Sequence, residues 1–159
     1  MYICGIVNVI SSLLSTQIVK RFGRRSILIW GHIGMTLVHA CVSIFDVYKV
    51  DNGVLPMILL FIFIYQFSSG PIAWIYAVET TIDVALGLVL LTLFSTIFVL
   101  SLVCPILMGK DSIGPNNVFI MFSAFSFLGA VYAFFVMKET KGLTDKEKKE
   151  LLMPNKYKE

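Results

Sequence analysis

Long stretches without a charged residue dominate this sequence of 159 residues. Five of them, each 19 to 26 residues long, contain no Asp, Glu, Lys or Arg. An α-helix rises about 1.5 Å per residue, so about 20 residues cross a hydrocarbon core about 30 Å thick. Because the core of a bilayer offers no hydrogen-bond partners, backbone groups must be paired within their own segment, which favours helices. The five predicted transmembrane segments are Met1–Val19, Ser26–Phe45, Val54–Val78, Val84–Gly109 and Ser112–Met137.

The predicted architecture is an all-α membrane protein with five transmembrane helices. We expect a transmembrane bundle over residues 1–137, with helices at about 1–19, 26–48, 54–78, 84–108 and 115–137, and a polar tail over 138–159. The chain is 57% hydrophobic and 14% charged, against about 25% charged residues in soluble domains. The lipid bilayer is therefore its predicted environment. The net charge of +3 comes from residues at membrane edges, so no nucleic-acid partner is expected.

Positive residues are concentrated on one side of the predicted topology. If the N-terminus lies outside, eleven of the 13 Lys and Arg residues are cytoplasmic, and Lys49 and Lys110 remain outside. Cytoplasmic segments of membrane proteins are enriched in Lys and Arg. We therefore expect an outside N-terminus and a cytoplasmic tail, with the plasma membrane as the location. A helix that starts outside at Met1 without a basic leader is expected to be part of a longer protein.

Polar residues within the apolar segments form stripes at helical spacing, which indicate faces turned toward protein or water. In the first segment one stripe contains Asn8 together with Gly5, Ser11, Ser12, Ser15 and Thr16, and in the third segment one contains Gln66 and Trp74. A carboxamide offers donors and an acceptor, as a pair of sugar hydroxyls requires. An indole adds a flat apolar wall with one N–H donor. These three residues are our candidates for substrate contact, and helix packing is the alternative interpretation.

Gly70 and Pro71 interrupt the third segment. Pro71 has no N–H to bond the carbonyl of Phe67 and its ring clashes there, so a kink or an open turn is predicted. Transporters place such broken helices at substrate sites and gates, although membrane helices also tolerate proline for structural reasons.

No catalytic group is evident in the sequence. His32 and His39 share a face of the second segment, and hydrogen-bonded interior histidines are the expected interpretation rather than a metal or proton site. Because no cluster of metal ligands, nucleophile with a base, or phosphate-binding loop is present, neither an enzyme activity nor a cofactor or metal is predicted.

Three short segments match motifs of a known protein family. Lys20-Arg21-Phe22-Gly23-Arg24-Arg25 resembles the R-x-G-R-R signature between helices eight and nine of the sugar porters in the major facilitator superfamily. Gly70-Pro71-Ile72-Ala73-Trp74, followed by Glu79, is similar to the G-P-I-x-W…E segment of helix ten. Lys138-Glu139-Thr140-Lys141-Gly142 resembles the P-E-T-K-G motif after helix twelve. Their order and separations agree with helices eight to twelve of a twelve-helix fold.

The resemblance implies a function and a set of functional residues. It implies transport of a hexose or related sugar by alternating access, with this chain forming part of the C-terminal six-helix bundle and a missing N-terminal bundle, or an oligomer partner, completing it. Asn8 and Trp74 resemble residues that contact or border the sugar. A cytoplasmic charge network is implied for Arg21, Arg24, Arg25, Glu79 and Glu139.

The sequence also departs from the family pattern. Lys20 stands where the family usually has an acidic residue, and Lys138 replaces the proline of P-E-T-K-G. The alternative function is therefore a truncated, non-transporting membrane protein or an assembly partner of another membrane subunit.

Overall fold

The fold was analysed in a computed structural model, which describes residues 2–81, 83–109, 112–144 and 146–148, apart from the side chains of 2–4, 16, 17, 20, 51, 83 and 84. The predicted tail beyond residue 148 and the side chain of Lys20 lie outside this description. The described chain forms six helices: α1 (Tyr2–Phe22), α2 (Arg24–Val47), α3 (Asp51–Phe67), α4 (Ser69–Thr80), α5 (Asp83–Leu107) and α6 (Gly114–Phe135).

The predicted all-helical membrane architecture is confirmed. Four described stretches are long and apolar enough to span a bilayer, and α3 and α4 together form one of them, Asn52–Thr80. The others are Arg24–Val47, Ala85–Leu107 and Gly114–Phe135. The fifth predicted crossing is α1, a helix of 21 residues whose shorter described apolar part is Gly5–Ser15.

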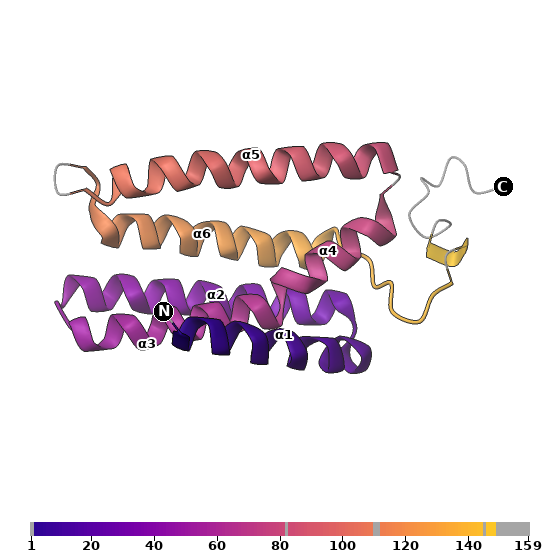
Figure 1. The fold of residues 1–159 in the computed structure, drawn as a ribbon, viewed down its shortest axis with the longest axis horizontal. Coiled ribbons are helices and arrows are strands. Elements are labelled where there is room, and N and C mark those ends of the chain that lie inside the picture. The colour runs from indigo at the N-terminus through magenta and orange to yellow at the C-terminus, as the bar shows by residue number, and fades with distance from the viewer. Residues whose placement is uncertain (1, 82, 110–111, 145, 149–159) are drawn as a thin grey trace.

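Helix α2 is the centre of the packed part of the bundle (Figure 1). It packs most extensively against α6 and α3, while α1 packs mainly against α3. Its buried residues recur at helical spacing, from Ile27 and Leu28 to Val42 and Ser43, as expected for a helix with one face in a core. Hydrogen bonds reinforce its pairing with α6, because the Ser123 hydroxyl donates to the carbonyl of Thr36 at 2.9 Å.

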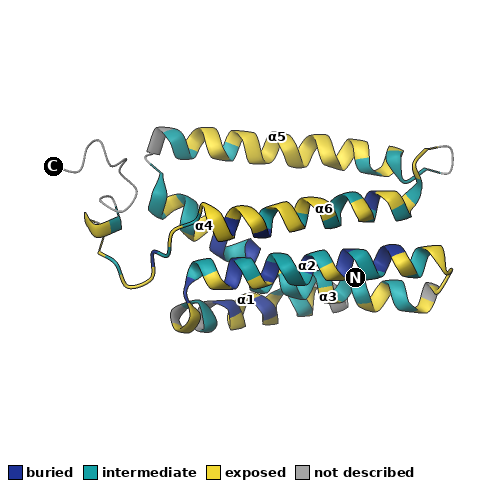
Figure 2. Ribbon diagram, turned by 180° about the vertical axis from the view of Figure 1, so that it is seen from behind, coloured by how far each residue is buried: buried dark blue, intermediate teal, exposed yellow. Residues whose placement is uncertain are grey.

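Helix α5 is the opposite case. It meets α6 at few points, and none of its described side chains is buried (Figure 2). The small apolar core lies instead between α2, α4 and the end of α6, where Ile27, Leu28, Ile72 and Ala133 form one cluster. This core supports the end of the bundle at which the loops and tail carry their charges.

Candidate functional site

The third predicted segment breaks at Ser68, between α3 and α4. Ser68 adopts φ −113° and ψ −80°, outside helical geometry. Pro71 cannot donate a hydrogen bond to the carbonyl of Phe67, which removes one bond of the helical ladder at this point. The Ser68 hydroxyl donates to the carbonyl of Ile64 at 2.6 Å, and the same carbonyl accepts the backbone N–H of Ser68 at 2.9 Å. The interruption predicted at Gly70 and Pro71 is thus observed at Ser68, two residues before Gly70.

Helix α2 provides the space for this break at Gly31. A Cβ atom added to Gly31 would lie 2.1 Å from the Ser68 hydroxyl oxygen and 2.3 Å from its Cβ, so no larger residue fits without displacing the turn. Ser68 and Ile72 are fully or almost fully buried at this contact. The break is therefore held inside the protein.

Two of the candidate substrate residues, Gln66 and Trp74, lie on the helices that meet at this break, whereas Asn8 lies on α1. No hydrogen bond among the described residues joins the three. Gln66 is half-buried in the last turn of α3, and its Oε1 lies 2.7 Å from where a Cβ of Gly70 would be. Trp74 in α4 is 44% exposed, and its ring centroid lies 6.5 Å from that of Phe94 in α5. Asn8 is half-buried in α1, and no described residue hydrogen-bonds its carboxamide. Because Gly70 has no Cβ, the Gln66 side chain can lie against the backbone at this position.

The polar stripe predicted on α1 divides between packing and exposure. Ser11 and Ser15 are fully buried, and the Ser11 hydroxyl donates to the carbonyl of Val7 at 2.6 Å. Gly5 and Ser12 are exposed, and the side chain of Thr16 lies outside the described residues. The buried serines therefore support the packing interpretation for this part of the stripe.

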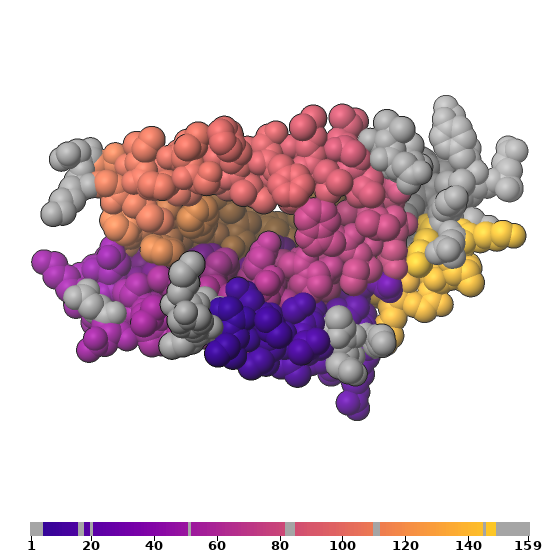
Figure 3. All heavy atoms as spheres, in the orientation of Figure 1, coloured from indigo at the N-terminus to yellow at the C-terminus, as the bar shows by residue number. Residues whose placement is uncertain are grey.

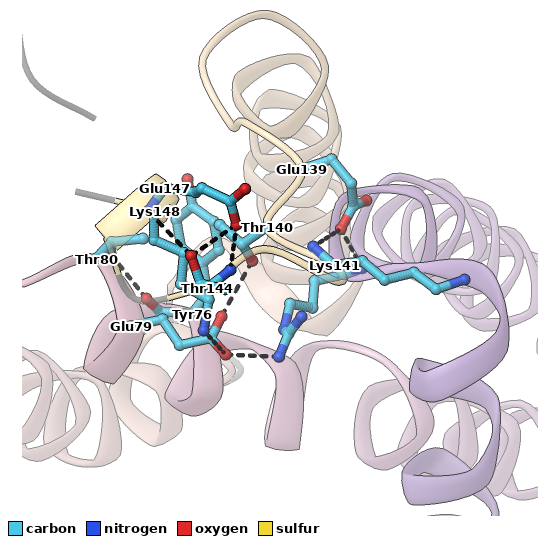
Figure 4. A network of polar contacts seen from close by, with 10 residues as sticks. Tyr76, Glu79, Thr80, Glu139, Thr140, Lys141, Thr144, Glu147 and Lys148 are labelled. Carbon is cyan, nitrogen blue, oxygen red and sulfur yellow. Dashed lines mark hydrogen bonds and ion pairs between the residues drawn. The ribbon is translucent and has the colours of Figure 1, made fainter. Parts of the chain in front are cut away.

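An ion pair joins the start of α2 to the end of α4 at the charged end of the bundle (Figure 4). The name "charged end" covers residues Arg21–Arg25, where α1 ends and α2 begins, together with Glu79, Glu139–Lys141 and Lys148. The Arg24 guanidinium lies 2.6 Å from Oε1 of Glu79, with both side chains less than one-fifth exposed. The hydroxyl of Thr140 donates to the other oxygen of Glu79 at 3.0 Å, and Lys148 Nζ lies 3.2 Å from Oε1. Glu79 therefore ties together α2, α4 and the segment after α6.

Glu139 binds the backbone at the start of α2 rather than a guanidinium. Its two oxygens accept the N–H groups of Arg24 at 3.0 Å and Arg25 at 3.1 Å. The first N–H groups of a helix have no partner within it, and the helix dipole favours a negative charge there. Gly23 makes this approach possible, because a Cβ at this position would lie 2.7 Å from Oε2 of Glu139.

The remaining predicted arginines reach other groups. Arg25 Nη2 donates to the carbonyl of Phe134 at 2.5 Å, and its guanidinium lies 5.7 Å from the centroid of the Phe134 ring. Arg21 is exposed, and its backbone carbonyl accepts a hydrogen bond from Lys141 Nζ at 2.7 Å. All five predicted residues thus lie at the charged end, and the one described ion pair between two of them joins Arg24 to Glu79.

Comparison with known proteins decides the family. The profile of the family described as "Sugar (and other) transporter" matches residues 1–152. The chain belongs to this sugar transporter family.

Individual relatives agree with the profile. The probable metabolite transport protein CsbC of Bacillus subtilis is 31% identical over 147 residues, which cover 87% of this chain and 32% of that protein. The glucose facilitated diffusion protein of Zymomonas mobilis is 39% identical over 77 residues, covering 47% of this chain and 16% of that protein. The chain thus spans about a third of the length of CsbC.

The fold is that of a solved sugar transporter. A crystal structure of a double-tryptophan variant of XylE, the xylose transporter from E. coli, superimposes with a TM-score of 0.89 at 22% sequence identity. The match covers 96% of this chain and 34% of XylE. The profile and the relatives confirm the predicted relationship to sugar porters, and the structural likeness confirms the predicted fold. An integral, multi-pass membrane protein is confirmed as well.

Within this sugar transporter fold, Thr140 and Lys148 were not predicted as members of the charged network. Thr140 is fully buried and neighbours Glu139 within the third motif, so the motif itself was a usable signal. Lys148 belongs to a tail segment that resembles an ordinary solvated surface, and its contact with Glu79 follows only from the folded arrangement.

The two histidines lie in an aromatic and polar environment between α2, α3 and α6. The ring centroid of His39 lies 4.6 Å from that of Phe61 and 5.9 Å from that of Phe122. Nδ1 of His32 is buried, and no described residue hydrogen-bonds it. At this nitrogen, His32 lacks the hydrogen bond that was expected for an interior histidine. The described residues contain no group of three or more His, Cys, Asp or Glu that could hold a metal ion.

Proposed function

We propose that this chain forms part of a membrane transporter that moves a hexose or related sugar by alternating access. The observation that carries the proposal is the charged end, where Glu79 binds Arg24, Thr140 and Lys148 at once. Partly shielded ion pairs that join separate helices can form and break as a unit when the bundle changes shape. Coupling of about 1–3 kcal/mol would change the ratio of two conformations about five- to 150-fold.

The substrate contacts belong to the membrane-embedded part of the bundle. Asn8, Gln66 and Trp74 are the proposed contacts, and the break at Ser68, with Gly70 and Pro71, is the proposed gate. Two properties support the assignment: Asn8 and Gln66 have carboxamides that no described residue hydrogen-bonds, and the adjacent helix is interrupted. Transporters bind substrate near the middle of the membrane, at such interrupted helices.

The partner of this chain is proposed to be the N-terminal bundle of the transporter. Figure 3 shows a hollow between α5 and the layer of α1 and α3, with α6 at its floor. No described residue of α5 is buried, so this helix has a large apolar surface for lipid or for further transmembrane helices. Additional helices of a longer transporter would fill the hollow and complete the substrate site.

The orientation in the membrane is proposed from the charges. We infer an outside N-terminus and a cytoplasmic charged end, because eleven of the 13 Lys and Arg residues then lie inside. The plasma membrane is the proposed location. Single cysteines at Asn52 and Lys146, in a variant without native cysteines, report the topology to an impermeant thiol reagent on intact cells. Labelling at Lys146 and not at Asn52 would contradict the proposed orientation.

A chimera tests the transport function. The amino-terminal two thirds of XylE are joined to this chain and expressed in cells without endogenous sugar uptake. We expect saturable uptake of a hexose or pentose that a competing sugar reduces, whereas this chain alone in liposomes gives none. A chimera that reaches the membrane in normal amounts and takes up no sugar above empty-vector cells would contradict the proposal.

A further inference from the structure

A groove of about 620 Å³ lies between α1 and α2 above α3. Both α1 and α2 pack on α3 but have few contacts with each other, which leaves the space between them open. The groove begins at the charged end of the bundle, beside Ser26, and continues along α2 to Gly34. Its apolar lining comes mainly from Ile18, Phe22, Trp30, Phe63 and Phe67.

Small residues on α2 and aromatic residues on α3 shape this groove. Gly31 and Gly34 line it without side chains of their own. The rings of Phe63 and Phe67 stack with centroids 6.0 Å apart and planes 11° apart. Trp30 is 72% exposed and Phe22 is 62% exposed, so large apolar surfaces are present at the edge of the groove. The lining suits a flexible hydrocarbon chain.

The charged end carries a cation next to the groove lining of α1. Arg21 follows the lining residue Ile18 by three residues, which places it on the same side of α1, about one helical turn further on. Its side chain is exposed, and it forms no ion pair with a described residue. The neighbouring Arg24 and Arg25 side chains are instead bound to Glu79 and to the Phe134 carbonyl. Ser26 adds an exposed side chain at the mouth.

We propose that this groove binds an anionic phospholipid. The phosphate lies at Arg21 and Ser26, and one acyl chain extends between Phe22 and Trp30 toward Gly34. The nine residues from Ser26 to Gly34 extend over about 12 Å along a helix, which accommodates the upper half of an acyl chain. The cation at the mouth favours an anionic over a zwitterionic headgroup, because each Lys or Arg near a membrane surface attracts anionic lipid. This site is independent of the proposed transport function.

Fluorescence quenching in lipid nanodiscs tests the site. Trp30 and Trp74 are the two tryptophans of the chain, so Trp74→Phe leaves Trp30 as the reporter in the groove. Brominated phosphatidylglycerol and brominated phosphatidylcholine are compared at equal mole fraction in unlabelled phosphatidylcholine. We expect stronger quenching by the phosphatidylglycerol. Arg21→Gln should lower the apparent preference about five-fold, the factor that one cation contributes near a membrane surface.

Two further variants give the controls. Lys146→Gln removes an exposed cation of the tail and should leave the preference unchanged, whereas Ser26→Phe should obstruct the mouth and weaken quenching by both lipids. Equal quenching by the two lipids, or an equal loss of preference in Lys146→Gln, would overturn the proposal. Displacement of the lipid by water-soluble glycerol phosphate would also overturn it, because the site would then bind phosphate alone. Quenching by neither lipid would indicate a protein-covered groove and would overturn it as well.

Discussion

The charged end of the bundle and its membrane-embedded polar face differ in how far their polar groups are satisfied. At the charged end, both oxygens of Glu79 and of Glu139 are bonded by described residues. Within the membrane, Asn8 has no hydrogen bond to a described residue, and the Ser69 hydroxyl is buried without such a partner. Unpaired polar groups are costly away from water. The two carboxylates of the charged end are thus satisfied within this chain, although the buried Nε atoms of Arg24 and Arg25 have no partner among the described residues. The membrane face requires water, substrate or another helix.

The largest expected effect is at the charged end. Glu79→Arg in the chimera replaces the shared acceptor of Arg24, Thr140 and Lys148 with a third cation, so repulsion replaces attraction. We expect this variant to reach the cell surface in normal amounts but to take up no sugar. Glu147→Arg is the matched charge reversal in the tail, where the carboxylate contacts Thr144, and it should leave uptake near that of the unmodified chimera. Equal uptake by both variants would show that the charge at Glu79 matters no more for transport than the charge at Glu147.

The membrane face should show smaller effects on transport. Asn8→Ala and Trp74→Ala in the chimera should each reduce sugar uptake about five- to 150-fold, because an unpaired hydrogen-bonding group costs about 1–3 kcal/mol. Asn117→Ala is the matched control, since Asn117 bonds only the nearby Ile113 carbonyl among described residues. Unchanged transport kinetics in both test variants would leave this face without a substrate role.

Stability of the isolated chain should depend on the backbone at Gly23. Its φ of 86° and ψ of 158° belong to a region that is almost restricted to glycine and costs other residues about 1–3 kcal/mol. Gly23→Ala should therefore lower the thermal unfolding temperature in detergent. In Gly87→Ala, within α5, the added Cβ meets nothing within 4 Å, so this control should unfold at the original temperature or slightly above it, because alanine favours a helix over glycine. Equal unfolding temperatures for both variants would contradict the role of Gly23 in admitting Glu139.

The smallest expected effect concerns the tail. The hydroxyl and the N–H of Thr144 both donate to Glu147, which lowers the pKa of that carboxyl below its ordinary value. A lowered pKa means that this contact stabilises the folded turn above the ordinary Glu pKa and is lost as the pH falls through the lowered value. Thr144→Val should raise the Glu147 pKa in an NMR titration of its carboxyl carbon. An identical Glu147 titration curve in Thr144→Val and in the unmodified chain would exclude this contact.

The sequence predicted the helices well and the contacts at the charged end only in part. Charge-free segments identify membrane helices because the bilayer requires paired backbone groups, so this inference needs no knowledge of packing. The position of the break depends on Gly31 as well as on Pro71, and Gly31 lies on another helix. Likewise, Glu139 could be assigned to the charged end from its motif, but its bonds to N–H groups depend on the turn at Gly23. Contacts of this kind join residues far apart in the sequence, so they become visible only in the folded structure.

A charge swap tests the central claim, that the Arg24–Glu79 contact controls transport, most directly. In the chimera, Glu79→Arg combined with Arg24→Glu restores opposite charges at the two positions that lie 2.6 Å apart here. Uptake of labelled sugar is measured against the Glu79→Arg variant, with both proteins quantified at the cell surface. The account predicts that the double variant recovers part of the uptake. No recovery, with both proteins present at the surface, would contradict it.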